Sequence, residues 1–214
     1  MPYNAEILAQ TYETHITVEC PTWRIPQFRE DCESIGVKPI VLDLQNNAGE
    51  SVMQDIMTSS KYVGPNPMDY MASIEQKLVN LGYSALRSKL ETTPWHPAAP
   101  TEANGRKIPK DCYFEAHLQI ETVPERLPEL REICMKQGAH LSRNVFKNNE
   151  FMVIVMATLR KYDQTTKQFV NDVTAFDLAL NQSDFWPKKI ETEYAIYDSN
   201  VHHDKKWVDA IISN

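Results

Sequence analysis

The chain has 214 residues, of which 42% are hydrophobic and 24% charged, and its net charge at pH 7 is −7. These proportions are typical of a globular protein and exclude bulk disorder and collagen-like or low-complexity fibres. The acidic balance argues against a nucleic-acid partner, because phosphate contacts depend on Lys and Arg. No apolar run reaches the roughly 20 residues of a membrane span, so no membrane partner is expected. The N-terminus lacks the basic and apolar stretches of a secretory signal. The four cysteines form no CxxC pair, which favours free thiols and a cytoplasmic protein: Cys20, Cys32, Cys112 and Cys134.

The first half of the chain predicts four strands and two helices. Residues 12–20 alternate polar and apolar side chains, which is typical of a strand with two different faces. Residues 25–35 carry a proline at their start and stop before Gly36, and these signals predict a helix. Further strands are predicted at 37–44, 52–62 and 83–91, and a helix with an apolar stripe at 68–81.

The second half of the chain repeats the first. Residues 13–19 (ETHITVE) match residues 115–121 (EAHLQIE), and residues 24–32 match residues 126–134 at the same offset of 102. Later positions match at an offset of 100, and we interpret the pattern as an ancient duplication. The second copy then has strands near 113–122, 139–147, 151–162 and 188–197, and helices near 126–137 and 166–181.

Each copy has the order β-α-β-β-α-β, which is the ferredoxin-like order, with both helices on one face of an antiparallel sheet. We therefore expect an α+β protein of two tandem ferredoxin-like repeats, at residues 1–92 and 106–200. Residues 93–105 form a Pro-rich linker, and residues 201–214 form a C-terminal tail that packs back through Trp207. The open face of each sheet needs a cover, either the other copy's sheet or a homodimer partner. Two antiparallel sheets that face each other would leave a central cleft.

The expected open faces are polar. The first strands present Glu13, His15, Thr17 and Glu19 in one copy, and Glu115, His117, Gln119 and Glu121 in the other. The second copy adds His140, Ser142, Asn144, Thr158, Arg160, Lys189, Glu191 and Glu193 from its other strands. An offset of 100 makes Ser60 the first-copy counterpart of Arg160. The second copy is the more polar, and the sequence predicts that it contacts the ligand more.

One motif suggests chemistry. His15-Ile16-Thr17-Val18 resembles the HxTx motif of the 2H phosphoesterases, which are duplicated, bilobal proteins with one such motif in each lobe. The resemblance implies that His15 and His117 act as general acid and base on a phosphodiester or cyclic phosphate. It also implies that Thr17 and Gln119 hold the phosphate, although Gln119 stands where the motif has Thr or Ser. Imidazole suits proton transfer at neutral pH because its pKa is near 6.5. We therefore predict a protein that binds a small anionic or phosphorylated molecule without a cofactor, with Thr17, Gln119 and Arg160 holding the anion.

Two other interpretations stay open. The polar faces could be solvated ladders of cross-strand ion pairs in a non-enzymatic ligand-binding or assembly module. Alternatively, Glu13, His15 and Glu19, or Glu115, His117 and Glu121, could supply nitrogen and oxygen ligands for a metal. A third ligand would then come from Glu91, Glu191 or Glu193. None of these spacings is diagnostic of a metal, so the sequence assigns no metal ligands.

Overall fold

The computed structural model describes residues 10–46, 48–102, 108–148 and 152–208. The first half contains β1 (Thr11–Glu19), α2 (Ile25–Ser34), β2 (Lys38–Gln45), β3 (Ser51–Val63), α3 (Pro67–Asn80) and β4 (Ser84–Thr92). The second half repeats this order with β5 (Tyr113–Thr122), α4 (Leu127–Gln137), β6 (Ala139–Asn148), β7 (Val153–Lys161), α5 (Thr166–Asn181) and β8 (Lys189–Asp198). A short helix, α6 (Lys205–Val208), follows. The predicted order of strands and helices agrees with the structure in both halves.

The eight strands form one antiparallel sheet that closes into a barrel, in the order β1-β3-β2-β6-β7-β5-β8-β4. Each half contributes four adjacent strands, and the halves meet at two seams, where β2 pairs with β6 and β4 pairs with β8. The expectation of two separate sheets facing each other across a cleft is therefore corrected. The outer strands of each half use their remaining backbone groups to pair with the other half, because such groups need hydrogen-bond partners. The space between the halves is the interior of the barrel.

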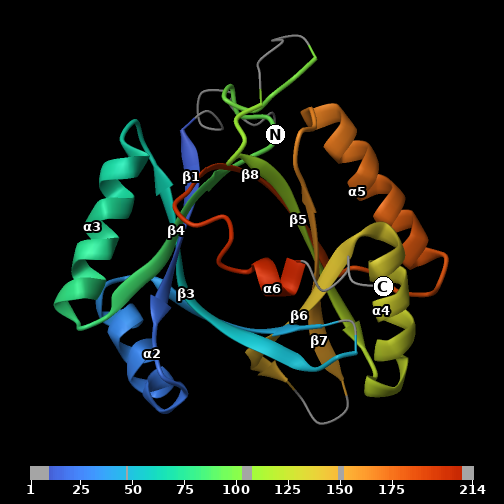
Figure 1. Cartoon of the computed structure of the whole chain (residues 1–214), viewed down its shortest axis with the longest axis horizontal. Helices are drawn as coiled ribbons and strands as arrows, with labels where there is room; N and C mark the ends of the chain where they lie inside the picture. Colours follow the sequence, from blue (N-terminus) through green and yellow to red (C-terminus); the bar gives the residue numbers. More distant parts are fainter. Residues whose placement is uncertain (1–9, 47, 103–107, 149–151, 209–214) are drawn as a thin grey trace.

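The four long helices lie outside the barrel, α2 and α3 against the first half and α4 and α5 against the second (Figure 1). The apolar side chains of β1 and β5 point outward to these helices. In the first half Ile16 packs in one core with Phe28, and in the second half Leu118 packs in another core with Phe176. Because strand side chains alternate, the polar residues between them point inward. Within the described residues, no helix is both long enough and apolar enough to cross a membrane.

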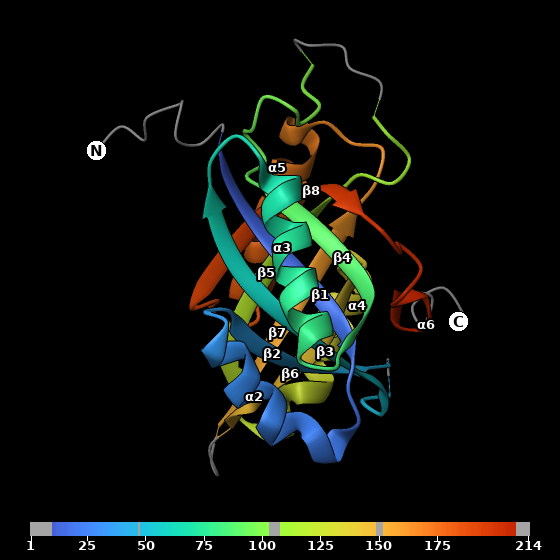
Figure 2. The ribbon, with the colours of Figure 1, turned by 90° about the vertical axis from the view of Figure 1, so that its left-hand side faces the viewer.

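The chain after β8 crosses one end of the barrel, and α6 lies there (Figures 1 and 2). Trp207 is buried, its indole Nε1 donates a hydrogen bond to the carbonyl of Leu141, and its ring lies against that of His140. Trp207 therefore packs back onto the second half. Residues 209–214 of the predicted tail and residues 103–105 of the predicted linker lie outside the described residues.

The described part of the segment between β4 and β5 also packs against the barrel. His96 and Ala99 are buried, and His96 Nε2 lies 3.2 Å from the hydroxyl of Tyr12. The hydroxyl of Thr166, at the start of α5, donates to the carbonyl of Pro94 at 2.8 Å. This segment therefore connects the first strand of one half with the last helix of the other.

Candidate functional site

The barrel encloses a cavity of about 490 Å³, which is lined by strands from both halves. The polar faces of the two first strands point into it, with Glu13, His15 and Thr17 from β1 and Glu115, His117 and Gln119 from β5. Glu19 and Glu121, which the sequence placed on the same faces, are exposed and do not line the cavity. The alternation of polar and apolar residues therefore identifies the inward face of β1 and of β5, but only the first three polar residues on each of these faces line the cavity.

In the first half, His15 lies among carboxylates. Its Nε2 atom is 3.1 Å from Glu91 Oε2 and 3.6 Å from Glu13 Oε1. Glu91 is only 1% exposed, and its other oxygen lies 2.5 Å from Lys89 Nζ, which also contacts Glu115 Oε2 at 2.9 Å. Burial raises the pKa of Glu91, and the charge of Lys89 opposes this rise. Lys89 thus links the carboxylates of the two halves.

In the second half, His117 has corresponding neighbours. Its Nε2 atom lies 3.4 Å from Glu193 Oε2 and 3.8 Å from Glu115 Oε2, and its Nδ1 atom is 3.0 Å from the hydroxyl of Thr158. Burial by itself would lower the pKa of His117, but the hydrogen bond and charge of Glu193, with the charge of Glu115, raise it to about 9. His117 is therefore held in its protonated form at neutral pH.

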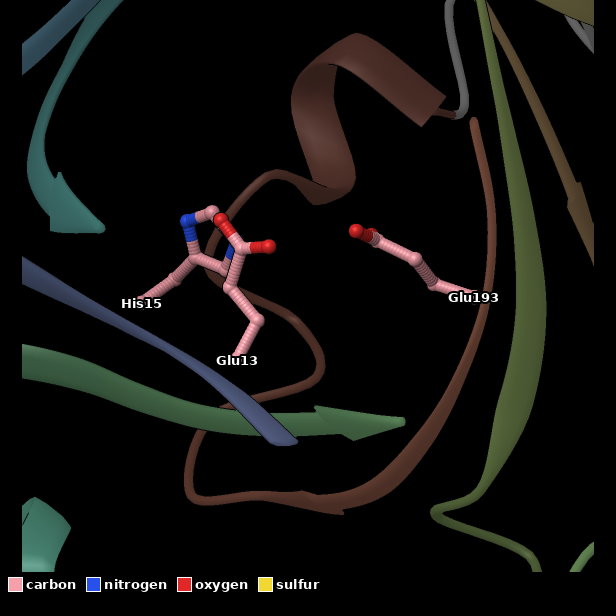
Figure 3. Close-up of side chains that lie close together, drawn as sticks. All are labelled: Glu13, His15 and Glu193. Atoms are coloured by element: carbon pink, nitrogen blue, oxygen red, sulfur yellow. The ribbon is translucent and has the colours of Figure 1, made fainter. Parts of the chain in front are cut away.

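The two histidines approach the same carboxylate. Glu13, His15 and Glu193 each place one potential metal-binding atom within 4.8 Å of the others, and their side chains converge in the interior (Figure 3). His117 contacts Glu193 as well. Glu193, on β8, therefore lies between a histidine of each half, so the duplicated motifs contribute to one site.

Arg160 is bound by carboxylates of the protein itself. Its Nε donates to Glu115 at 2.7 Å, and its two terminal nitrogens donate to Asp204 at 3.0 and 2.7 Å. Arg87, on β4, also donates to Asp204, at 3.1 Å, and to Asp198. Burial would raise the pKa of Asp204, but Arg160 and Arg87 lower it to about 2. A carboxylate from the segment after β8 thus joins two arginines inside the barrel.

Neither Arg87 nor Asp204 was among the predicted ligand-binding residues. Arg87 shares its strand face with Lys89 and Glu91, so the alternation of β4 was a usable signal. Asp204 lies in an irregular segment just before α6, where no periodicity indicates which way a side chain points.

The other predicted ligand-binding residues divide into two groups. Thr158 on β7, Ser142 and Asn144 on β6, and Lys189 and Glu191 on β8 line the cavity. Lys189 and Glu191 pair with each other at 2.6 Å, and both are partly exposed. His140 is buried against Trp207 and does not line the cavity, and burial lowers its pKa to about 4. His140 therefore packs against the C-terminal segment.

The predicted counterpart of Arg160 is wrong by one residue. Arg160 lies opposite Glu115 in the β5–β7 pair, and Lys61 lies opposite Glu13 in the β1–β3 pair. Ser60 instead lies opposite Thr14, and their hydroxyls are 2.8 Å apart. A slip of one residue moves a strand position to the other face of the sheet. Lys61 is therefore the first-half counterpart of Arg160.

The cavity lining still differs between the halves. The second strand of the first half, β2, contributes the apolar Ile40, Leu42 and Leu44. Its counterpart β6 contributes Ser142 and Asn144. The second half is therefore the more polar along this pair of strands.

Comparison with known proteins gives only distant likenesses. No protein-family model and no curated protein matches the sequence. The regulatory subunit of aspartate kinase from Thermus thermophilus, in its ligand-free form, has 9% identity and a TM-score of 0.30, over 80% of this chain and 93% of that chain. A putative monooxygenase from Lactobacillus acidophilus NCFM has 10% identity and a TM-score of 0.30, over 87% and 93%. The chlorite dismutase of Candidatus Nitrospira defluvii in complex with imidazole has 11% identity and a TM-score of 0.27, over 94% of both chains.

These scores are too low to carry an argument about function. None of the three structures is a 2H phosphoesterase, so the resemblance of the histidine motifs to that family gains no support from them.

Proposed function

We propose that the protein binds a small phosphorylated molecule in the barrel interior and that His15 and His117 exchange protons with it during hydrolysis of a phosphodiester. The observation that carries the proposal is the convergence of two histidines, one from each half, on one cavity of the barrel, beside Glu193. The volume of about 490 Å³ lies within the range of small-molecule sites.

Donors for an anionic group are present along the cavity wall. His117 offers a protonated imidazole, and Thr158 beside it offers a hydroxyl. Lys61 and Lys189 also line the cavity, and their exposed, flexible side chains can reach an anion that enters it. Charge-assisted hydrogen bonds of this kind are the stronger ones for phosphate oxygens. Arg160 makes three hydrogen bonds to Glu115 and Asp204, whereas Nε2 of His117 lies 3.4 Å from Glu193, so we place the phosphate nearer to the histidines.

The two histidines have different surroundings, which suggests different roles. In the proposed reaction His15 takes a proton from a water molecule, and the water oxygen bonds to phosphorus. The bond from phosphorus to the leaving alcohol oxygen breaks as His117 gives its proton to that oxygen. The carboxylates of Glu13 and Glu91 stabilise the imidazolium that forms at His15, because they lie 3.6 and 3.1 Å from its Nε2 atom.

The test is hydrolysis of a cyclic nucleotide and of an activated phosphodiester by the full-length chain, with calorimetric binding of the same compounds. We expect His15→Gln and His117→Gln each to reduce kcat/KM by at least 100-fold, a typical contribution of general acid–base catalysis. His202→Gln is the matched control, because His202 is exposed and does not line the cavity. Wild-type hydrolysis in both cavity variants would refute the acid–base roles. Absence of binding by the wild-type chain would refute the proposed function.

A further inference from the structure

We infer that Glu13, His15 and Glu193 form a binding site for one divalent transition-metal ion inside the barrel. The site goes beyond the proposed function and stands without it, because it rests on the arrangement of these three side chains and their neighbours. Glu13 and His15 come from the inner face of β1, and Glu193 comes from β8, on the other side of β4 (Figure 3).

The geometry suits a single ion. One ligand atom from each of the three side chains lies within 4.8 Å of the others. Ligand atoms at roughly 2.0–2.2 Å from a common ion lie about 3–4 Å apart, so small side-chain rotations close the site. Three protein ligands also leave coordination positions open for water or for oxygen atoms of a bound molecule.

A second, independent observation comes from Glu91, which lies beside this group. Glu91 is 1% exposed, and its oxygens lie 3.1 Å from His15 Nε2 and 2.5 Å from Lys89 Nζ, but among the described residues neither contact has the geometry of a hydrogen bond. Buried carboxylates normally have hydrogen bonds as well as a counter-charge. A metal ion beside Glu91 would give this buried carboxylate a further partner, either directly or through a bound water.

The balance of charge also favours a cation here. The carboxylates of Glu13, Glu91, Glu115 and Glu193 surround the two histidines, while Lys89 is the buried lysine that contacts two of them. Lys61 reaches Glu13 only at 3.9 Å, and its side chain is 73% exposed. Arg160 forms ion pairs with both Glu115 and Asp204, so its positive charge is shared by two carboxylates. Four carboxylates thus face Lys89 and the imidazolium of His117, and a divalent ion would offset the negative charge that remains.

The donor set selects the class of metal. One imidazole nitrogen and two or three carboxylate oxygens suit zinc or manganese. Thiolates take no part, because all four cysteines lie in or against the cores under the helices: Cys32 and Cys20 in the first half, Cys112 and Cys134 in the second. A metal at this position would lie in the cavity where the proposed ligand binds and would occupy His15, so His15 acts as the base of the proposed reaction only in the metal-free chain.

The experiment uses the full-length chain stripped of metal, titrated calorimetrically with Zn²⁺ and, separately, with Mn²⁺ followed by electron paramagnetic resonance. We expect one ion per chain, with affinity reduced at least tenfold in Glu193→Gln and in His15→Gln. Glu121→Gln is the matched control, because Glu121 lies on β5 but is exposed and outside the cavity. Circular dichroism checks that each variant is folded, and Glu13→Gln replaces any variant that is not.

Two results would overturn the site: no saturable binding of either metal by the wild-type chain, or equal affinity in the wild-type chain and all folded cluster variants. The outcome is separable from that of the proposed function. Phosphodiester hydrolysis by the metal-free chain in the presence of a chelator would uphold the histidine chemistry even where metal binding fails. Metal binding by a chain without hydrolytic activity would uphold the site alone.

Discussion

Asp204 offers the sharpest test of how the interior is held together. It is 3% exposed and accepts three hydrogen bonds, one from Arg87 and two from Arg160, which bring the segment after β8 onto two strands of the barrel. Asp204→Asn keeps the size of the side chain but removes its charge. The change leaves two buried guanidinium groups without one of their counter-charges.

The expected loss of stability depends on the counter-charges that Arg87 and Arg160 keep. Removing one partner of a buried ion pair costs about 3–5 kcal/mol when the other charge is left uncompensated. Here Arg87 keeps Asp198 and Arg160 keeps Glu115, so each cation retains a carboxylate. We therefore expect the free energy of unfolding to fall by a smaller amount, about 2–3 kcal/mol.

Urea denaturation followed by circular dichroism measures this loss, and tryptophan fluorescence reports on the surroundings of Trp207, which is buried three residues after Asp204. Asp111→Asn is the control, since Asp111 is exposed in the turn before β5 and should change stability by less than about 0.5 kcal/mol. A change in Asp204→Asn as small as that in the control would refute the reasoning.

Three further predictions concern stability. The folded protein holds the pKa of His140 at about 4, below its ordinary value of 6.5, so the unfolded chain binds the proton more tightly. His140 by itself should therefore lower the free energy of unfolding by about 3 kcal/mol as the pH drops from 6.5 to 4. Urea titrations at several pH values should show a smaller fall in His140→Phe, and an equal fall would contradict the assignment. Thr165 caps α5, because its side chain accepts a hydrogen bond from the backbone of Gln168 and the side chain of Gln168 accepts one from the backbone of Thr165. Thr165→Ala should therefore lower the free energy of unfolding by about 1 kcal/mol in the same assay. An unchanged free energy would mean that the cap is not formed in solution. Phe176 lies on the buried side of α5 and is completely buried, so Phe176→Ala should lower the free energy of unfolding by about 3–5 kcal/mol. Leu178→Ala, on the exposed side of the same helix, should lower it by less than about 1 kcal/mol. Similar losses in the two variants would contradict this packing.

The sequence predicted the inward faces of the strands where the alternation was regular. The pattern around His15 and its repeat around His117 identified which side chains would lie opposite the helices, because a strand has only two faces. Helices α2, α3 and α4 were predictable from their apolar positions and from proline and glycine at their ends. Both kinds of signal are local, and each depends on a few neighbouring residues.

The features that depend on contacts between distant parts of the chain were not predictable in this way. The pairing of β2 with β6, and of β4 with β8, leaves no pattern in either strand, so closure of the sheet had no signal. Glu193 was predicted in the site, but its approach to His15 depends on that closure. The prediction that Ser60 is the counterpart of Arg160 was wrong, because the pairing with β1 and β5 places Lys61 opposite Glu13 and Arg160 opposite Glu115. An alignment at a fixed offset of 100 does not detect this shift of one residue.

Closure of the barrel also affects the chain before folding is complete. In the closed sheet each of the eight strands has a neighbour on both sides. A chain with only one half folded exposes β2 and β4, or β6 and β8, as open edges, and such edges are templates for pairing with another chain. The complementary edges of a second half-folded chain are the ones that fit, so domain-swapped dimers are the natural product of misassembly. Refolding of this protein is therefore a competition between closure within one chain and exchange between two, and dilution favours closure.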